Sequence, residues 1–248
     1  MVKPRDGILI DCIKSLISEQ PQSRRYERKC KLRYGQSLYI ESELRALGFH
    51  ETYMPRSVSS IYFDDESFSF AKANLDGIRY RIKPRLRWYN AETNNATLEL
   101  KYRDGFNGYK KQFAHYSFNK NNTSYSAIIG VIQEELRNAL HLSNLLPSSQ
   151  VNYDRRYFEH ASGIRATIDT CITVNTPGFT ESIINQTIPL GFEVLEIKYI
   201  PRLDNYIREF IYPSLSRLSI RLTKCSKYVE SIKSVSDNVM QSNLDDLE

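Results

Sequence analysis

The stretch that decides the fold is 78–89, which reads Ile78, Arg79, Tyr80, Arg81, Ile82, Lys83, Pro84, Arg85, Leu86, Arg87, Trp88, Tyr89. Every odd position from Arg79 to Arg87 is a cation, and every even position is apolar or aromatic. This period of two predicts a β-strand with two different faces. The strand alone leaves two interpretations open: a sheet with one wet face, or a row of cations for a polyanion.

The same alternation recurs along the chain, and it predicts further strands over residues 24–34, 58–63, 97–103, 109–118, 151–159, 164–170 and 192–199, with a last strand and turn over 220–227. On three of these strands a glutamate stands two residues before a lysine: Glu27 and Lys29, Glu99 and Lys101, Glu196 and Lys198. Helical spacing instead predicts helices over 8–17, 36–47, 124–142 and 201–213, the last of which ends at Pro213.

Composition favours a soluble protein with a phosphate-bearing partner. The 248 residues carry a net charge of +5, and 41% of them are hydrophobic, which suffices for a sizeable core. The four cysteines have no metal-ligand spacing and are expected to be free thiols in a reducing compartment. The first residues do not form a secretory signal, and no apolar run approaches the ~20 residues of a membrane span. We therefore expect a cytoplasmic protein.

Three regions are expected. Residues 1–22 hold an amphipathic helix that caps a barrel mouth, lies on a membrane or touches a partner, and the cap is the commonest of these cases. Residues 23–233 form a single domain, because no linker divides them. Residues 234–248 form an acidic, polar and flexible tail.

The strands are best explained together as an α+β fold built on a mainly antiparallel, closed β-barrel. The apolar side of the sheet would face outward under flanking helices, and the cationic side would line the lumen. Such a lumen is unfavourable alone, because buried like charges repel and each unpaired ion costs several kcal/mol. Inward carboxylates and a bound polyanion would relieve this cost. Glu27, Glu99 and Glu196 are either internal salt-bridge partners or ligands of Mg²⁺ or Mn²⁺, ions that accept one or two carboxylates together with phosphate oxygens and water.

Eight short motifs give the chain a resemblance to a known family. In order they are YERK (26–29), SIYFDD (60–65), RLRWY (85–89), LELK (98–101), YDRRYF (153–158), IRATID (164–169), VLEIK (194–198) and SKY (226–228). With these motifs the chain, from about Arg25 to Ile232, resembles the polyphosphate polymerase domain of the vacuolar transporter chaperone (VTC) type. That domain belongs to the triphosphate tunnel metalloenzyme superfamily.

The resemblance implies a set of site residues. The catalytic cations would be Arg85, Arg87, Lys101, Arg155, Arg165, Lys198 and Lys227. Further phosphate contacts would come from Lys29, Arg81, Lys83, Lys110, Tyr153, Lys224 and Ser226. Glu196 would hold the Mn²⁺ or Mg²⁺, with Glu27 and Glu99 as second carboxylates.

The implied activity is a metal-dependent phosphotransferase that passes the γ-phosphate of ATP to inorganic polyphosphate. A triphosphatase, with water as acceptor, and a non-catalytic polyphosphate- or inositol-phosphate-binding module are the alternatives. Nucleic acid is not expected as a partner, because Tyr80, Trp88 and Tyr102 fall on the apolar face rather than among the cations. Any export of polymer would need a separate membrane-protein partner.

Two positions depart from the expected pattern. Pro84 lies inside the central strand, where it removes a ladder N–H, so a bulge or an edge position is expected there. Cys225 stands where the family usually has an aromatic residue.

Overall fold

The alternating stretches form one antiparallel sheet in the computed structural model, which describes residues 4–18, 25–90, 92–105, 107–117, 125–142, 144–175 and 187–245. The strands are β1 (Tyr26–Arg33), β2 (Phe49–Asp64), β3 (Tyr80–Tyr89), β4 (Ala96–Asp104), β5 (Asn107–Tyr116), β6 (Leu146–His160), β7 (Arg165–Asn175), β8 (Thr187–Pro189) and β9 (Phe192–Tyr199). The longer helices are α1 (Pro4–Ser18), α2 (Ser37–Ala46), α3 (Ser69–Asp76), α4 (Tyr125–Leu140) and α7 (Lys227–Asp245). A short 3₁₀ turn, η1 (Thr93–Asn95), precedes β4.

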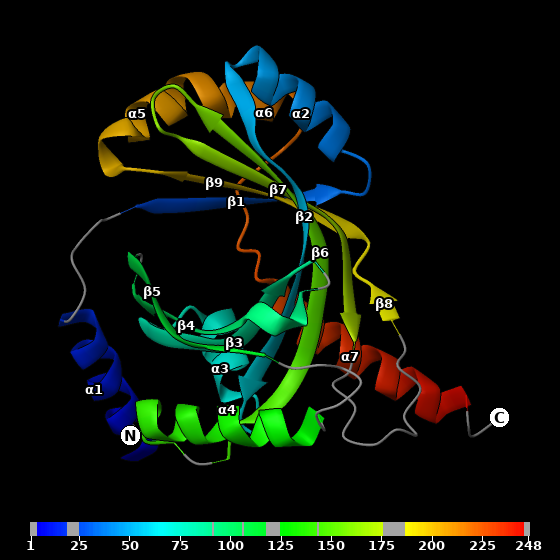
Figure 1. The fold of residues 1–248 in the computed structure, drawn as a ribbon. Helices are drawn as coiled ribbons and strands as arrows, with labels where there is room; N and C mark the ends of the chain where they lie inside the picture. Colours follow the sequence, from blue (N-terminus) through cyan, green and yellow to red (C-terminus); the bar gives the residue numbers. More distant parts are fainter. Residues whose placement is uncertain are drawn as a thin grey trace.

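The sheet has the order β1-β9-β7-β6-β2-β3-β4-β5, with β8 beside β7. Figure 1 shows that it curls strongly, so that its two edge strands, β1 and β5, face each other. The mainly antiparallel α+β architecture is confirmed, but the closed barrel is not, because these two strands do not pair in the described part of the chain. The outer edge of β1 pairs with another segment: the N–H of Thr223 donates to the carbonyl of Lys29 (2.8 Å), and Thr223 Oγ1 accepts from the N–H of Lys31 (2.9 Å).

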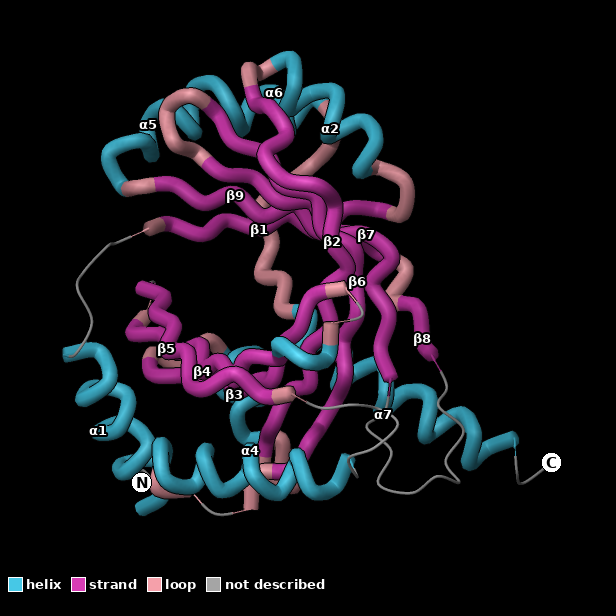
Figure 2. Tube along the Cα trace, viewed as in Figure 1, coloured by secondary structure: helices cyan, strands magenta, loops and turns pink. Residues whose placement is uncertain are grey.

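Figure 2 shows helices along the outer side of the curled sheet. Apolar side chains of the strands pack against them. Below, Ile82 and Leu98 of the sheet pack with Ile132 and Leu136 of α4. Above, the outer face of β7 and β9 packs against α2 and the helices that follow β9. A third cluster joins the long strands β2 and β6 to α7 through Val58, Val151 and Tyr228. In β3 and β4 the period of two separates a dry outer face from a charged inner face, as predicted. The third cluster instead lies on the inner face, because Val151 stands opposite Ser60, which also stands opposite Arg87.

Pro84 interrupts no pairing in β3. It lies opposite Leu100 in an unbroken register with β4, while the ladder between β3 and β2 ends one residue away, at Arg85. The missing N–H is tolerated because Pro84 stands just beyond the β2 ladder. The expected edge position is thus found, and no bulge is needed.

The helical region after β9 differs from the prediction. It comprises η2 (Pro201–Leu203), α5 (Asp204–Tyr206), the π-helical turn η3 (Ile207–Ile211) and α6 (Tyr212–Arg217), so Pro213 does not end it. Pro213 falls in the first turn of α6, after the π-turn, where a proline needs no intrahelical N–H partner.

The C-terminal segment also differs. Residues 221–226 are irregular rather than a strand, and α7 runs without a break from Lys227 to Asp245, across the predicted start of the tail at residue 234. Residues 246–248 of the predicted tail lie outside the described residues, as do residues 1–3 and 19–22 of the predicted N-terminal region.

Two aspartates at the end of β2, Asp64 and Asp65, bind the first turns of α3 and α7. Asp65 accepts hydrogen bonds from the N–H groups of Ser67 (3.0 Å) and Ser69 (3.1 Å). Asp64 accepts from the N–H of Phe70 (3.0 Å) and also from the hydroxyl of Tyr228 in the first turn of α7. A carboxylate that binds the free N–H groups of a helix stabilises its N-terminus. The two aspartates of the SIYFDD motif are therefore structural, and Asp64 places α7 against the sheet.

The N-terminal helix α1 packs on the outer face of the lower half of the sheet rather than over the lumen. Its Ile13 and Leu16 are buried, and the carbonyl of Leu16 accepts a hydrogen bond from the hydroxyl of Tyr102 (3.0 Å). No helix among the described residues is long and apolar enough to cross a membrane.

Candidate functional site: a cationic lumen

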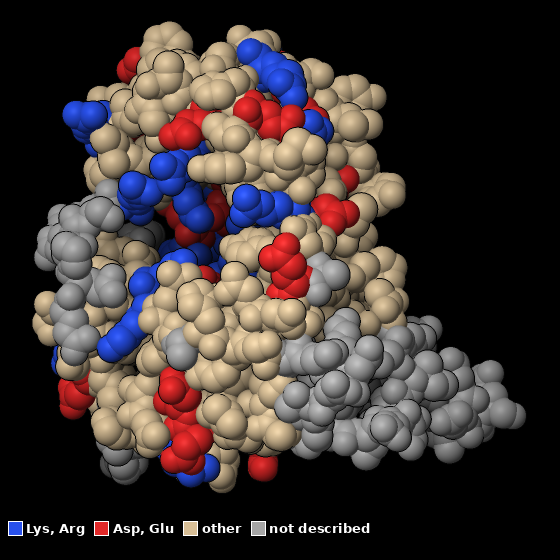
Figure 3. All heavy atoms as spheres, in the orientation of Figure 1, with Lys and Arg blue, Asp and Glu red and all other residues tan. Residues whose placement is uncertain are grey.

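The inner face of the curled sheet carries most of the predicted site. In the registers, Arg85 lies opposite Glu99, Lys83 opposite Lys101, and Lys29 opposite Glu196. Directly opposite residues of an antiparallel pair point to the same face. Figure 3 shows the resulting hollow between the two halves of the molecule, lined by blue side chains with red ones behind them.

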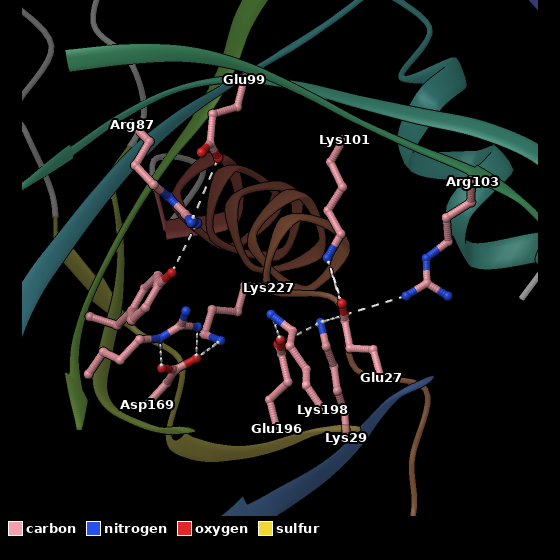
Figure 4. A network of polar contacts seen from close by, with 12 residues as sticks. Glu27, Lys29, Arg87, Glu99, Lys101, Arg103, Asp169, Glu196, Lys198 and Lys227 are labelled. Atoms are coloured by element: carbon pink, nitrogen blue, oxygen red, sulfur yellow. Dashed lines mark hydrogen bonds and ion pairs between the residues drawn. The ribbon is translucent and has the colours of Figure 1, made fainter. Parts of the chain in front are cut away.

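A first cluster joins β1 to β9. The ammonium of Lys29 lies 3.2 Å from Glu27 Oε1 and 3.4 Å from Glu196 Oε2, and Lys198 Nζ lies 2.6 Å from Glu196 Oε1. Figure 4 shows these side chains meeting in the lumen. Burial raises the pKa of both carboxyls, but the nearby lysines outweigh it, so the pKa of Glu27 and that of Glu196 lie below their usual range. Both groups are therefore carboxylates at neutral pH.

Ion pairs from Glu27 span the opening between the sheet's two ends. Lys101 Nζ and Arg103 Nη2 of β4 lie 3.1 Å and 3.4 Å from the Glu27 carboxylate of β1. These ion pairs link β1 to β4, between which there is no backbone hydrogen bonding in the described residues. On this side the wall of the lumen is therefore formed by charged side chains.

A second cluster surrounds Glu99, and it satisfies both oxygens of this carboxylate. Oε2 accepts from Nε and Nη2 of Arg85 (2.9 and 2.6 Å), while Oε1 accepts from Lys110 (3.0 Å) and Gln112 (3.1 Å). Two donors of Arg85 thus converge on one carboxylate oxygen, and the other oxygen is left to Lys110 and Gln112.

A third cluster is centred on Asp169, a fully buried residue of β7. It accepts hydrogen bonds from Arg155 Nε (2.6 Å) and Nη2 (2.8 Å), and it also binds the ammonium of Lys227. Lys227 in turn lies 4.6 Å from the centre of the Tyr153 ring. Burial opposes the charged form of Asp169, but Arg155 and Lys227 outweigh this and lower its pKa to about 2.

We expect Asp169→Asn to destabilise the fold by about 3–5 kcal/mol, because it leaves two buried cations without their carboxylate. The folded-state pKa of about 2 lies below the ordinary value of 3.8, so the contribution of Asp169 is fully present above about pH 4 and is lost as the pH falls towards 2. Urea denaturation at pH 7 and at pH 3 measures it: the difference between wild type and variant should shrink at pH 3.

The matched control is Asp104→Asn, which removes the same charge from an ion pair with Arg79, a side chain that is 67% exposed. An exposed pair contributes about 0–1 kcal/mol. An Asp169 variant that loses no more stability than the Asp104 variant would contradict the prediction.

Several lumen cations have no carboxylate at hydrogen-bond distance among the described residues. Arg87 donates to Ser60 Oγ (3.1 Å) and to the hydroxyl of Tyr153 (3.0 Å), and its nearest carboxylate oxygen, on Glu99, is 3.8 Å away. Lys83 donates to Ser226 Oγ (2.9 Å). Burial, reinforced by Lys29 and Lys101, brings the pKa of Lys83 well below its usual range.

Lys101 also has a lowered pKa. Burial lowers it to about 7, although Glu27 beside it favours the charged form and Lys29 opposes it again. Burial is thus the largest cause for both lysines, and neighbouring lysines add to it. A bound polyanion would favour the charged form of both.

A cavity of about 440 Å³ opens at one end of the tunnel. The end of α3, residues 222–226 and the first turn of α7 form its outer wall, while Lys29, Lys83 and Lys101 line its inner side. Ser226 and Lys224 lie on the outer wall, and Arg81 also borders the cavity. Two of the predicted phosphate contacts, Lys224 and Ser226, thus border the same cavity as Lys29, Lys83 and Lys101.

The residues present fit a divalent metal held in part by substrate. The described residues contain no group of three or more His, Cys, Asp or Glu that could hold an ion alone. Glu27 and Glu196 nevertheless converge on one cation, the ammonium of Lys29, which stands where a metal could lie. Two carboxylates with phosphate oxygens and water suffice for Mg²⁺ or Mn²⁺. Glu99 fits less well, because both of its oxygens are already occupied by donors.

The structure brings most of the predicted residues together, with exceptions. Arg165 lies opposite Lys198 in the register, but its side chain is 57% exposed and pairs with Glu159 (3.4 Å). The side chain of Lys110 is 47% exposed, although it contacts Glu99. Three lumen residues were not predicted as site residues. Arg103 and Gln112 each stand two residues from a predicted lysine, and Asp169 stands four residues from Arg165, so all three share the face of a predicted residue. That spacing was the available signal.

Comparison with known proteins gives one family match. The model of the VTC domain family matches residues 22–236. No curated protein matches the chain.

Solved structures with a similar chain trace include a protein of Pyrococcus horikoshii OT3, with 14% identity, a TM-score of 0.47, and coverage of 84% of this chain and 99% of that one. A second is a putative adenylyl cyclase from Hippeastrum with a dominant triphosphatase activity, with 12% identity, a TM-score of 0.49, and coverage of 82% and 93%. A third is an inorganic triphosphatase, with 12% identity, a TM-score of 0.29, and coverage of 77% and 82%.

Proposed function

Because the chain belongs to the VTC domain family, we propose that it is a polyphosphate polymerase that transfers the γ-phosphate of ATP to a growing chain of inorganic phosphate. The observation that carries the proposal is the set of lumen cations, above all the buried Arg87 and the half-buried Lys83, which have no carboxylate at hydrogen-bond distance among the described residues. A ligand with charge repeated at short spacing would neutralise all of them at once.

Phosphoryl transfer requires no covalent intermediate with a side chain of the protein. The terminal phosphate oxygen of the chain attacks the γ-phosphorus, the bond to the β-γ bridging oxygen breaks, and ADP leaves. The protein must hold two polyanions in line and neutralise charge on the transferred group. Arg87 can donate a fork to the phosphoryl oxygens, and Arg85 and Arg155 are held rigidly by Glu99 and Asp169 on either side.

The carboxylates have a separate role. Glu196 and Glu27 would hold Mn²⁺ or Mg²⁺, which when bound neutralises phosphate oxygens as a Lewis acid. Lys29 and Lys198, which now contact Glu196, would then be released towards phosphate. Tyr153 orients Arg87 through its hydroxyl and contacts Lys227 through its ring.

Incubation of the purified protein with ATP and Mn²⁺ or Mg²⁺ tests the proposal. We expect ADP together with long phosphate polymer, resolved by gel electrophoresis. Orthophosphate without polymer would instead establish a triphosphatase. If neither appears but tripolyphosphate raises the melting temperature, the chain is a binding module; a ligand at 100 times its Kd adds about 2.7 kcal/mol of stability.

The cytoplasmic location and the separate membrane-protein partner for polymer export belong to this proposal. Nothing in the lumen itself requires either one.

A further inference from the structure

A buried hydroxyl on the inner face of the sheet, that of Thr167, has no hydrogen-bond partner among the described residues. Thr167 lies in β7 between Ala166 and Ile168, which are both buried in the outer core, so its own side chain points to the lumen. The buried hydroxyls of Tyr116 and Tyr212 belong instead to residues that pack against the two outer clusters. Thr167 therefore needs an explanation that concerns the lumen.

A buried hydroxyl without a hydrogen bond is unfavourable, because the group loses its contact with water and gains no bond in return. A valine has nearly the same shape and would fill the position of Thr167 without this cost. Buried polar groups of folded proteins are almost always paired. The unpaired hydroxyl therefore points to a bond that forms when the lumen holds its ligands.

The strand register places Thr167 directly opposite Glu196. The two residues pair between β7 and β9, and Tyr157 of β6 pairs with Thr167 from the other side. Directly opposite residues point to the same face and hold their Cβ atoms about 4.5–5.5 Å apart. A rotation of the Glu196 side chain therefore brings its carboxylate within reach of the Thr167 hydroxyl.

Glu196 now has lysines at both of its oxygens. Lys198 Nζ lies 2.6 Å from Oε1, and Lys29 Nζ lies 3.4 Å from Oε2. In the function proposed above, both lysines turn to phosphate and the carboxylate holds the metal. A carboxylate that binds a metal through one oxygen keeps its orientation through a hydrogen bond to the other. Once the lysines have turned away, that oxygen needs a new donor.

The other cations near Glu196 are already engaged. Arg155 donates to Asp169 from Nε (2.6 Å) and Nη2 (2.8 Å). Lys101 donates to Glu27 (3.1 Å). The hydroxyl of Thr167 is free to donate without breaking either ion pair.

We propose that Thr167 is a positioning residue for the metal-binding carboxylate. Its hydroxyl donates to one oxygen of Glu196 after Lys29 and Lys198 have turned to phosphate, and this bond holds the other oxygen towards the metal. The inference rests on the function proposed above, in which Glu196 binds Mn²⁺ or Mg²⁺. The role needs a hydroxyl and no charge, so a serine can perform it and a valine cannot.

The affinity for Mn²⁺ tests this role without turnover. Calorimetry is done with saturating adenosine (β,γ-methylene)triphosphate, which is not cleaved between the β- and γ-phosphates, and is corrected for Mn²⁺ bound by the nucleotide alone. Mn²⁺ should bind Thr167→Val about tenfold more weakly than the wild type, the lower end of the loss when a metal ligand loses its hydrogen-bond partner. Thr167→Ser should bind Mn²⁺ as the wild type does.

The matched control is Thr173→Val. It makes the same change in the same strand, six residues away and hence about 20 Å along β7. Its affinity for Mn²⁺ should equal that of the wild type. Wild-type affinity in Thr167→Val, or a serine variant as weak as the valine variant, would overturn the proposal.

Two measurements without metal separate positioning from other roles. Thr167→Val should melt at the wild-type temperature or above it, because the hydroxyl that it removes has no partner in the protein alone. Its affinity for tripolyphosphate should equal that of the wild type. A lower melting temperature would indicate a structural role, and weaker binding of tripolyphosphate would indicate direct contact with phosphate; either result contradicts the inference.

Polymer formation by the wild type is scored separately. If the wild type makes polymer while Thr167→Val binds Mn²⁺ normally, the polymerase stands and the positioning role falls. If the wild type makes no polymer but its affinity for Mn²⁺ depends on the Thr167 hydroxyl, the positioning role stands and the polymerase does not.

Discussion

Glu196→Gln is expected to lower turnover of ATP by about 100-fold or more while binding of tripolyphosphate remains. Glu196 has a 6%-exposed side chain and lies between two lysines, at 2.6 Å from Lys198 and 3.4 Å from Lys29. The amide has nearly the same shape as the carboxylate, but it is a poor ligand for a divalent ion. The loss should therefore fall on kcat, where the metal neutralises developing charge.

Anion binding should behave in the opposite way. Removing the carboxylate frees the two lysines, so tripolyphosphate should bind the variant at least as tightly as it binds the wild type. Turnover with increasing Mn²⁺ and the shift in melting temperature with tripolyphosphate measure the two effects separately. The control is Glu159→Gln, which removes the same charge from a pair with the exposed Arg165. Wild-type turnover in the Glu196 variant would remove this residue from the mechanism.

The sequence predicted the inner and outer faces of the sheet because one rule governs both. Arg85 and Leu86 are neighbours in the chain, yet one binds Glu99 in the lumen and the other is buried in the outer core. A strand sends successive side chains to opposite faces, so the alternation could be read without knowledge of the strand's neighbours. The same rule located Lys29, Lys101 and Glu196.

The opening of the sheet could not be predicted in this way. Whether β1 pairs with β5 depends on what else competes for the edge of β1, and that competitor is Thr223, nearly 200 residues away in the chain. Local periodicity carries no information on such a contact. The helix likewise continues past Pro213 because a π-helical turn precedes this residue, and the spacing of residues in the sequence does not predict such a turn.

The ion-pair partners of the predicted cations could not be predicted from the alternation either. Alternation placed Asp169 on the inner face, but not within reach of both Arg155 and Lys227, because Lys227 lies on α7 and α7 is set by the contact between Asp64 and Tyr228. Such long-range contacts decide which lumen cations have a carboxylate at hydrogen-bond distance. Arg85 has one, on Glu99, whereas Arg87 does not.

Arg87→Ala is accordingly expected to reduce kcat/KM by about 100- to 1,000-fold, the loss that follows removal of one fixed donor to a developing oxyanion. Its side chain is 9% exposed and is held by Ser60 and Tyr153, both neutral, so its charge is directed into the lumen without a carboxylate at hydrogen-bond distance. Arg85, by contrast, already donates two hydrogen bonds to Glu99, so its charge is partly neutralised before phosphate binds. Steady-state kinetics with ATP and a phosphate-chain acceptor measure the loss.

Arg87→Lys separates charge from geometry. Lysine restores a point charge but not the planar fork, so we expect it to recover binding of tripolyphosphate while kcat stays well below the wild-type value. Arg79→Ala is the control: it removes a cation at the same period from the same run of sequence, but from an exposed pair with Asp104. If Arg87→Lys turned over ATP as fast as the wild type, the guanidinium would serve as general electrostatic attraction rather than as a shaped donor to the transferred phosphoryl group, because only the latter needs two parallel N–H bonds.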